Sequence, residues 1–413
     1  MKMTLDQRVE KHTIKSSDPY YSLIKHYCHM SKNLYNHGNY LIRQAFCKED
    51  DSRYLSYYDI EKLTKQDKEY LDYRMMPSAQ SAQNTLRLLD QNWKSFFAAI
   101  KDFKKHKDKY LGRPKLPRYL KKNSEHLFFF TYQEVRLKSD NLLYFPKTLK
   151  DFTLKPKCIY KDNFNKIQQV RFLPRRNKIE IEVVYTINLP ESKQDNNRYL
   201  GIDIGVDNLA TCVTSDNSQD FILNGRPLKS INQYYNKKSS RLKSILKLRN
   251  DKHHSNQLDK LTDKRNNKIR DYLQKASKYI VDYCYSHEIN TIVIGTNPKW
   301  KQKCNIGKKN NQTFIQIPFA KLIDQIMYKA KELGITVIKT EESYTSGTSY
   351  LDNELPTKEF YNKSRRIKRG LFKSNDGILI NADQNAAYQI LKKEFPITWD
   401  RGEVLSPFLV NLC

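Results

Sequence analysis

The sequence predicts a multi-domain α+β protein in which helices come first, short strands follow, and strands alternating with helices come last. Apolar residues recur at helical spacing between residues 20 and 103. Short runs rich in aromatic and β-branched residues alternate with turn residues between 127 and 187. From residue 199 onward, apolar strand patterns are interleaved with amphipathic helical ones, which indicates an α/β domain.

Charge is the strongest signal in the composition. The 413 residues include 74 Lys+Arg and 45 Asp+Glu, which gives a formal net charge of +29. An excess of this size repels itself, so a polyanion such as nucleic acid is the expected partner. The 28 Tyr and 18 Phe could add stacking on bases.

Membranes and an oxidising compartment fit the sequence less well. No apolar run approaches the length of a membrane span, and no signal-like segment opens the chain. The seven cysteines form no CxxC pair, so neither a disulfide framework nor a zinc site is expected. These features are typical of a protein of a reducing cytoplasm.

Two long helices are expected in the N-terminal part, over residues 20–46 and from Pro77 onward. In the second helix apolar residues alternate by four and three, which is the spacing of a two-helix seam. The residues of this seam are Ala82, Leu86, Leu89, Trp93, Phe96, Ile100 and Phe103. We expect the aromatic ones to be core residues rather than platforms on which bases stack.

A dense set of cations follows over residues 101–122, where Gly112, Pro114 and Pro117 break any helix. Such a run is often only a solvated surface. A cationic loop stiffened by prolines is nevertheless well suited to contact phosphates, and we expect this one to bind nucleic acid. The predicted contacts are Lys104, Lys105, Arg113, Lys115 and Arg118.

The strand predicted over residues 199–206 contains a carboxylate in an apolar setting. The even-numbered residues from Leu200 to Val206 are apolar and share one face, whereas Asp203 lies on the other face between two glycines. An acid in this position needs a partner, because burying an unpaired charge is unfavourable. A bound cation would be such a partner; the alternative is a solvated strand residue.

The following segments have the order of a ribonuclease-H-like sheet, with three meander strands and then strands alternating with helices. Strands are expected at residues 208–215, 219–223, 291–294 and 336–339, and helices from Pro318 and over residues 383–393. A hairpin is expected around Ser374-Asn375-Asp376-Gly377.

Asp383 opens the last of these helices. A first-turn aspartate is often only a helix cap, but together with Asp203 it looks like half of a two-metal site. Such sites hold two Mg²⁺ ions about 3.5–4 Å apart. Mn²⁺ is a possible substitute, and at least three carboxylates are normally needed.

The third carboxylate is expected just after strand 291–294, but the residue there is Gly295. The next strand, 336–339, should be a parallel neighbour at about 4.8 Å. A glutamate just past its end could reach the same space. We therefore expect Glu342 to be the third catalytic and metal-binding residue, with Glu341 as the alternative. Both could instead be exposed loop acids.

Short motifs at separate places support this reading. They are Leu34-Tyr35-Asn36 with Arg43-Gln44, Pro77-Ser78-Ala79-Gln80, the stretch from Phe96 to Tyr119, Gly201–Val206, Tyr344-Thr345-Ser346, and Asp383–Ala387. In this order they resemble the signatures of the TnpB family of transposon-encoded RNA-guided nucleases, relatives of the type V CRISPR effectors. The last three match its RuvC motifs.

The resemblance implies a helical recognition (REC-like) domain, residues 19–120, inserted in an oligonucleotide-binding β-barrel (WED-like) formed by residues 1–18 and 121–195. A RuvC-like nuclease domain, residues 196–413, would follow, with a target-binding insertion at 345–382. The implied activity is Mg²⁺-dependent, RNA-guided cleavage of double-stranded DNA beside a short flanking motif. The implied partners are a transposon-end or CRISPR-like guide RNA and target DNA, in the prokaryotic cytoplasm, with a monomer as the default.

The sequence departs from the family at two places. Many members have glutamate at the position of Gly295. A branch with the pattern Ile-Gly-x-Asn-x-x-Trp-Lys, which residues 294–301 show, has this glutamate at another place in the sequence, and Glu342 fits that place. Many members also have a four-cysteine zinc finger before the last aspartate, whereas residues 346–383 contain no cysteine, so no zinc is expected. Further nucleic-acid contacts are predicted at Lys301, Arg365, Arg366, Lys368 and Arg369.

Other functions remain open at this point. The unexpected Gly295 allows a nuclease-dead, RNA-guided DNA-binding protein that represses by occupying DNA, although both aspartates are retained. A small type V CRISPR effector would have the same chemistry. A Holliday-junction resolvase would need little beyond the sheet, and a DNA-nicking transposase would need a paired-histidine metal motif, for which the only nearby pair is His253-His254.

Overall fold

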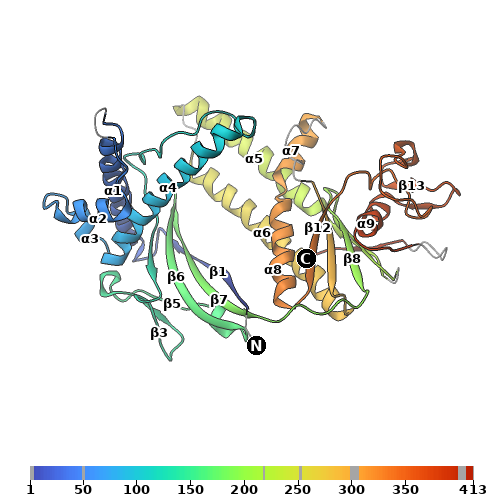
Figure 1. Cartoon of the computed structure of the whole chain (residues 1–413), viewed down its shortest axis with the longest axis horizontal. Coiled ribbons are helices and arrows are strands. Elements are labelled where there is room, and N and C mark those ends of the chain that lie inside the picture. The colour runs from blue at the N-terminus through green and yellow to red at the C-terminus, as the bar shows by residue number, and fades with distance from the viewer. Residues whose placement is uncertain are drawn as a thin grey trace. The chain divides into compact units, whose positions relative to one another are not determined.

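A computed structural model describes residues 4–48, 52–216, 219–250, 254–297, 307–398 and 406–412 of the chain. The chain divides into two compact units (Figure 1). The N-terminal unit is Leu5–Asn188, and the C-terminal unit is Leu189–Cys413 together with Met1–Thr4. None of the described helices is both long and apolar enough to cross a membrane.

The N-terminal unit begins with a strand and continues with a group of helices. These elements are β1 (Thr4–Lys15), α1 (Tyr21–Phe46), α2 (Tyr57–Gln66), α3 (Asp72–Met75), α4 (Ala79–Lys105) and the 3₁₀ turn η1 (Lys107–Lys109). The apolar periodicity predicted α1 and α4, and both are found. It missed α2 and α3, because helices of 10 and 4 residues are too short to repeat an apolar pattern.

Helices α1 and α4 pack along the predicted seam. Trp93 is fully buried, and its indole Nε1 donates a hydrogen bond to Asn39 on α1 at 2.9 Å. Gly38 allows a close approach, since a Cβ there would lie 2.8 Å from Leu89 and 2.9 Å from Leu86. The seam therefore fixes how these two helices lie against each other.

The strands of the N-terminal unit form two sheets. The first has the order β1-β7-β6-β2, with β2 (Phe128–Thr131), β6 (Phe164–Arg175) and β7 (Lys178–Leu189). The second contains β3 (Arg136–Leu137), β4 (Leu143–Tyr144) and β5 (Thr153–Leu154), with the turns η2 (Lys147–Leu149) and η3 (Cys158–Tyr160) nearby in sequence. In the described part of the unit, the segments expected to form the β-barrel thus lie in two sheets, and β1 and β2 are the edges of the larger one.

The C-terminal unit is built on a six-stranded sheet of order β12-β11-β8-β9-β10-β15. Its strands are β8 (Tyr199–Asp203), β9 (Asn208–Thr214), β10 (Phe221–Asn224), β11 (Thr291–Thr296), β12 (Thr336–Glu341) and β15 (Phe408–Val410). The first three form an antiparallel meander, and β11 and β12 run parallel to β8. This is the predicted ribonuclease-H-like order; β15, of 3 residues, was not predicted.

Helices cover both faces of this sheet. They are α5 (Arg226–Asn250), α6 (Asn256–Ser286), α7 (Lys308–Gln316), α8 (Phe319–Glu332) and α9 (Ala382–Lys392). Leu200 and Ile202 of β8 lie in one core with residues of α6 and α8. On the other face α9 lies directly on β8, since a Cβ at Gly201 would be 2.8 Å from the Ala387 carbonyl oxygen. Figure 1 shows α8 and α9 on opposite sides of the strands.

Before α9 the chain forms a small hairpin. It contains η4 (Lys363–Arg365), β13 (Leu371–Lys373) and β14 (Leu379–Asn381), with the two strands paired antiparallel. The Ser374 amide donates to the Ile378 carbonyl at 2.9 Å, and Gly377 has a φ of 84°, which favours glycine. The hairpin predicted around residues 374–377 is confirmed.

Candidate active site

The face of β8 that is covered by α9 is the face on which Asp203 lies. Gly201 and Asp203 are two residues apart and so point to the same side, while Leu200 and Ile202 point into the opposite core. The predicted separation of the apolar residues from the carboxylate is confirmed. Asp203 is the last residue of β8, at the carboxyl end of the strand.

Asp203 lies among other carboxylates. Its side chain keeps some accessible surface, but protein atoms crowd its carboxyl group. Burial raises the pKa of Asp203 well above its usual value, and the charges of Asp383 and Glu342 raise this pKa further, while Arg366 opposes them. Two segments far apart in sequence from β8 therefore bring Glu342 and Asp383 close enough to Asp203 to act on its charge.

These acids do not form a finished metal cage. Among the described residues, no group of three or more His, Cys, Asp or Glu side chains has the arrangement that would hold a metal ion. The oxygen donors are nevertheless of the kind that Mg²⁺ and Mn²⁺ prefer, and a cation would relieve the repulsion that raises the pKa of Asp203. The chemistry of the donor set therefore fits a hard divalent cation.

Glu342 is positioned by the end of β12. The parallel register pairs Thr296 with Glu341, and the Glu342 amide then donates to the Thr296 carbonyl at 3.3 Å. Thr345 Oγ1 donates to the Glu342 carbonyl at 2.8 Å, which closes the turn that follows. Glu342 is half-buried, whereas Glu341 is exposed and its carboxylate accepts a hydrogen bond from Ser343. The acid that acts on Asp203 is thus Glu342.

Gly295 lies where the third acid was first expected. The register that pairs Ile294 with Ile202 places Gly295 opposite Asp203, one step further along the strands. A Cβ at Gly295 would lie 2.4 Å from Cδ1 of Ile390 on α9. The Ile390 side chain of α9 therefore occupies the space that a Cβ at position 295 would take, and the acid that acts on Asp203 comes from the turn after the next strand instead.

Asp383 is not the cap of α9. Asn381 performs that role, since its side chain accepts hydrogen bonds from the amides of Asp383 at 2.9 Å and Gln384 at 3.2 Å. Both carboxylate oxygens of Asp383 have other partners. Asn208 Nδ2 donates to one at 2.8 Å, and the Arg366 guanidinium donates to the other at 3.0 Å. Asp383 thus does not cap α9, and its carboxylate binds Asn208 of β9 and Arg366 instead.

A buried network that the sequence did not predict holds α9 in place. Asp220, after β9, accepts hydrogen bonds from Gln384 and Tyr388 on α9, each at 2.6 Å, and from the Thr214 amide at 3.0 Å. Burial raises the pKa of Asp220 despite these donors. Asn385 donates to the Thr348 carbonyl at 2.8 Å, which links α9 to the segment after Glu342. Nothing in the sequence signals a contact across 164 positions.

Most of the predicted cations near the hairpin have acidic partners in the protein. Arg365 binds Glu354 at 2.6 Å, Arg366 binds Asp383, and Arg369 binds Asp207, which also pairs with Lys229 at 2.6 Å. Lys368 is exposed. Lys301 lies outside the described residues. Arg366 is the important case, because its guanidinium neutralises one of the three acids of the site.

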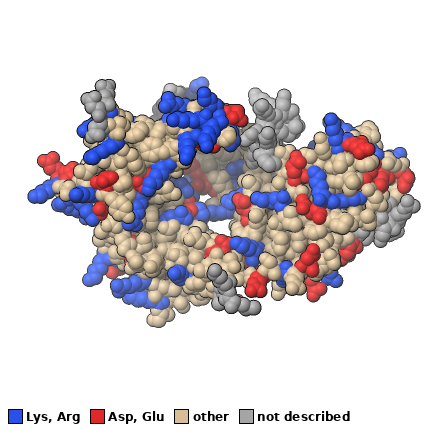
Figure 2. Space-filling view, in the orientation of Figure 1, with Lys and Arg blue, Asp and Glu red and all other residues tan. Residues whose placement is uncertain are grey.

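The cations predicted in the N-terminal unit lie on its surface. Lys104 and Lys105 are in the last turn of α4, and Arg113, Lys115 and Arg118 follow in the irregular segment after it; all five are exposed. Figure 2 shows Lys and Arg gathered over the C-terminal end of α4. This surface has the charge that a phosphate backbone requires.

Comparisons with known proteins agree with these features. A family model for OrfB_IS605, described as a probable transposase, matches residues 179–301, and a model of the Cas12f1-like TNB domain matches residues 319–390. None of the curated proteins compared matches the chain.

Several solved structures are similar over most of the chain. A Cas12f1–sgRNA–target DNA complex has a TM-score of 0.38 and 15% identity, covering 94% of this chain and 100% of its own. A CRISPR-Cas12f ternary complex has a TM-score of 0.37 and 15% identity, covering 93% and 83%. C2c1 of Alicyclobacillus acidoterrestris with single-guide RNA has a TM-score of 0.38 and 9% identity, covering 90% and 66%.

The two matched segments contain β8 with Asp203 and α9 with Asp383, the elements on which the site is built. The family that the motifs in the sequence predicted is thus found in these two segments: residues 179–301 match the OrfB_IS605 (TnpB) transposase model, and residues 319–390 match the Cas12f1-like TNB domain.

Proposed function

We propose that the protein is an RNA-guided DNA endonuclease whose catalytic residues are Asp203, Glu342 and Asp383. The observation that supports this most strongly is the raised pKa of Asp203, caused by its burial and by the two other acids. Placing two further acids beside the buried Asp203 does not stabilise a fold, because their charges oppose the ionisation of Asp203. Holding divalent cations for phosphodiester hydrolysis is a functional reason for this placement.

The residues around the acids have separate tasks in this proposal. Bound Mg²⁺ ions would activate water and stabilise the leaving oxygen. Asp203 and Glu342 would hold the ions from β8 and from the turn after β12, and Asp383 would hold them from α9. Asn208 orients the Asp383 carboxylate by its hydrogen bond. Arg366 would have to release Asp383 as the ions bind, since both compete for the same oxygens.

The remaining parts of the chain would bind nucleic acid. Residues 19–120 would act as a REC-like domain and residues 1–18 with 121–195 as a WED-like one, holding a guide RNA and target DNA. Residues 345–382, within a RuvC-like domain at 196–413, would contact the guide–target duplex without zinc. The net charge of +29 and the exposed cations after α4 support these roles.

Plasmid cleavage with the co-purified RNA tests the proposal. We expect linearisation beside a short fixed motif with Mg²⁺, and none with EDTA or after the RNA is digested. RNA-dependent binding of the same target without any cut would contradict the nuclease and favour the alternative, a repressor that occupies DNA. The salt bridge of Arg366 with Asp383 is the observation that favours that second function.

A thermal measurement tests the site without any substrate. In EDTA we expect Asp203→Asn to raise stability by roughly 1–3 kcal/mol, because it removes a crowded charge whose ionised form the fold disfavours. Added Mg²⁺ should raise the unfolding temperature of the wild type but not of the variant. The control is Asp282→Asn, an exposed acid paired with Lys278, which should change neither result. Equal stabilisation of wild type and Asp203→Asn by Mg²⁺ would contradict the assignment.

A further inference from the structure

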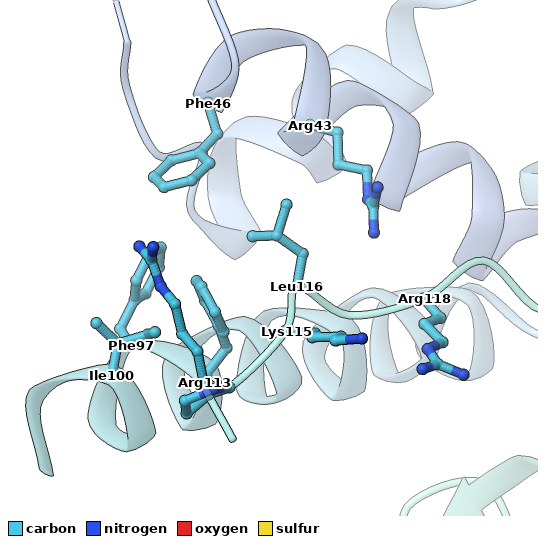
Figure 3. Close-up of a pocket in the computed structure, with 10 residues that line it drawn as sticks. Arg43, Phe46, Phe97, Ile100, Arg113, Lys115, Leu116 and Arg118 are labelled. Atoms are coloured by element: carbon cyan, nitrogen blue, oxygen red, sulfur yellow. The ribbon is translucent and has the colours of Figure 1, made fainter. Parts of the chain in front are cut away.

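The N-terminal unit contains a pocket that the catalytic proposal does not use. It has a volume of about 600 Å³ and lies between α1, α4 and the segment of residues 113–118 (Figure 3). We name it the α1–α4 pocket. Its volume falls in the range of about 300–1,000 Å³ that is usual for small-ligand sites.

One side of the α1–α4 pocket is aromatic. Phe46 comes from α1, and Phe96 and Phe97 come from the end of α4. Their rings lean on one another and on the buried Trp93, with centroid distances of 6.0 Å for Trp93–Phe96 and 5.6 Å for Phe46–Phe97. Trp93 is a core residue, as expected, but the other three are only half-buried. Part of the predicted core seam is therefore an accessible aromatic wall.

The other side of the pocket is cationic. Its lining includes Arg43, Arg113, Lys115 and Arg118 and no acidic residue. Arg113, Lys115 and Arg118 have exposed side chains. Figure 3 shows the segment of these residues crossing α4, with Leu116 pointing toward α1. A negatively charged group at this rim would meet no repulsion from the residues that line it.

The cationic segment is held rigidly against α1. The Pro117 carbonyl accepts hydrogen bonds from Arg43 at 2.6 Å and from Asn39 at 3.2 Å. Asn36 exchanges two hydrogen bonds with the backbone of Leu120, at 2.9 and 2.8 Å. Because these contacts fix the backbone before any ligand arrives, binding would lose little entropy in ordering the loop.

We propose that the α1–α4 pocket binds one unstacked nucleotide of a single-stranded nucleic acid. The base would lie on Phe96 and Phe97, and the flanking phosphates would contact Arg113 and Arg118. An apolar peptide would cover the aromatic wall but leave the four cations unpaired. The inference deepens the proposed function, on which it rests for the presence of a nucleic acid partner, and it requires neither metal nor cleavage.

The test uses the full chain, freed of co-purified RNA, in EDTA. A short single-stranded RNA with 5-iodouridine at one position is bound, irradiated and digested with protease, and the crosslinked peptide is identified by mass spectrometry. We expect crosslinks in the segment of Phe96 and Phe97. We also expect Phe96→Ala to weaken binding about tenfold, on the scale of one lost stacking contact, and Arg113→Glu to weaken it as well.

Two matched variants separate binding from folding and from general charge. Phe96→Leu keeps an apolar side chain against Trp93 but removes the aromatic face, so it should fold normally and still bind weakly. Lys68→Glu changes the charge at an exposed site in the same unit that does not line the pocket, and it should bind more tightly than Arg113→Glu. Wild-type affinity in Phe96→Leu, or crosslinks only elsewhere, would overturn the proposal.

The source of the nucleotide is decided by the same assay. Equal binding of RNA and DNA single strands supports a site that reads base and phosphate, and preference for RNA supports an additional contact to the 2′-hydroxyl. Equal competition by a duplex against the single-stranded RNA would overturn the inference, because a paired base cannot enter the α1–α4 pocket. If no nucleotide binds in the α1–α4 pocket but plasmid cleavage persists, only this inference is wrong. If cleavage is absent but the crosslink persists, only the proposed nuclease activity is wrong.

Discussion

Glu342→Gln is expected to reduce metal-dependent DNA cleavage by about a hundredfold or more while leaving RNA-dependent target binding unchanged. The substitution keeps the size of the side chain and removes the negative charge that acts on Asp203. Loss of one preorganised electrostatic contact at a reacting phosphate has effects of this order. Cleavage of a plasmid and binding of the same target, measured on one preparation, give both values.

Glu341→Gln is the matched control. It makes the same chemical change one residue earlier, on an exposed side chain whose carboxylate accepts from Ser343. We expect nearly wild-type cleavage from this protein, both with Mg²⁺ and with Mn²⁺ in the assay. Full activity of Glu342→Gln would remove that residue from the site, and selective loss in Glu341→Gln would assign the role to its neighbour.

The sheet and the position of Asp203 could be predicted because alternation along a strand is local information. The apolar face from Leu200 and the glycines two residues before and after Asp203 are all visible within a few residues. The reach of Glu342 toward Asp203 was predicted from parallel pairing, and the register of β11 with β12 has this form. Short or irregular elements, such as α3 and β15, have no such repeat and were missed.

The partners of the polar side chains could not be predicted. Asn208 and Asp383 are 175 positions apart, and only the packing of α9 on β8 brings them together. Arg366 was assigned to nucleic acid because of its charge, yet it binds Asp383. The sequence does not show whether an Arg or Lys will pair with a phosphate or with a carboxylate, because the side chain donates the same hydrogen bonds to both.

The aromatic residues of α4 show the same limit. Trp93 and Phe96 both belong to the apolar seam, but one is fully buried and the other lines the α1–α4 pocket. The spacing of a helix fixes the face on which a residue lies. Whether that face is covered along its whole length depends on the segment after α4, whose path is set by hydrogen bonds to Asn36 and Asn39.

Gly295→Ala is expected to destabilise the C-terminal unit by roughly 1–3 kcal/mol, the usual effect of overpacking a filled core. The added Cβ would lie 2.4 Å from Cδ1 and 3.1 Å from Cγ1 of Ile390, so the Ile390 side chain would have to shift within the filled core between α9 and β11. Chemical denaturation, or hydrogen exchange of the α9 amides, measures the change. The control is Gly112→Ala, where a Cβ would have no neighbour within 4 Å and stability should hardly change.

A double-mutant cycle with Ile390→Val then identifies the cause. Valine lacks the Cδ1 atom, so Gly295→Ala should be clearly less destabilising in that background than in the wild type. Additive effects would show that Ile390 is not what excludes a side chain at position 295. If the coupling is found, Gly295→Glu should also fail to restore cleavage to Glu342→Gln, because the Ile390 side chain fills the space beside position 295. The third acid would then have to come from the turn after β12. Recovery of cleavage in the Gly295→Glu, Glu342→Gln protein would contradict this explanation.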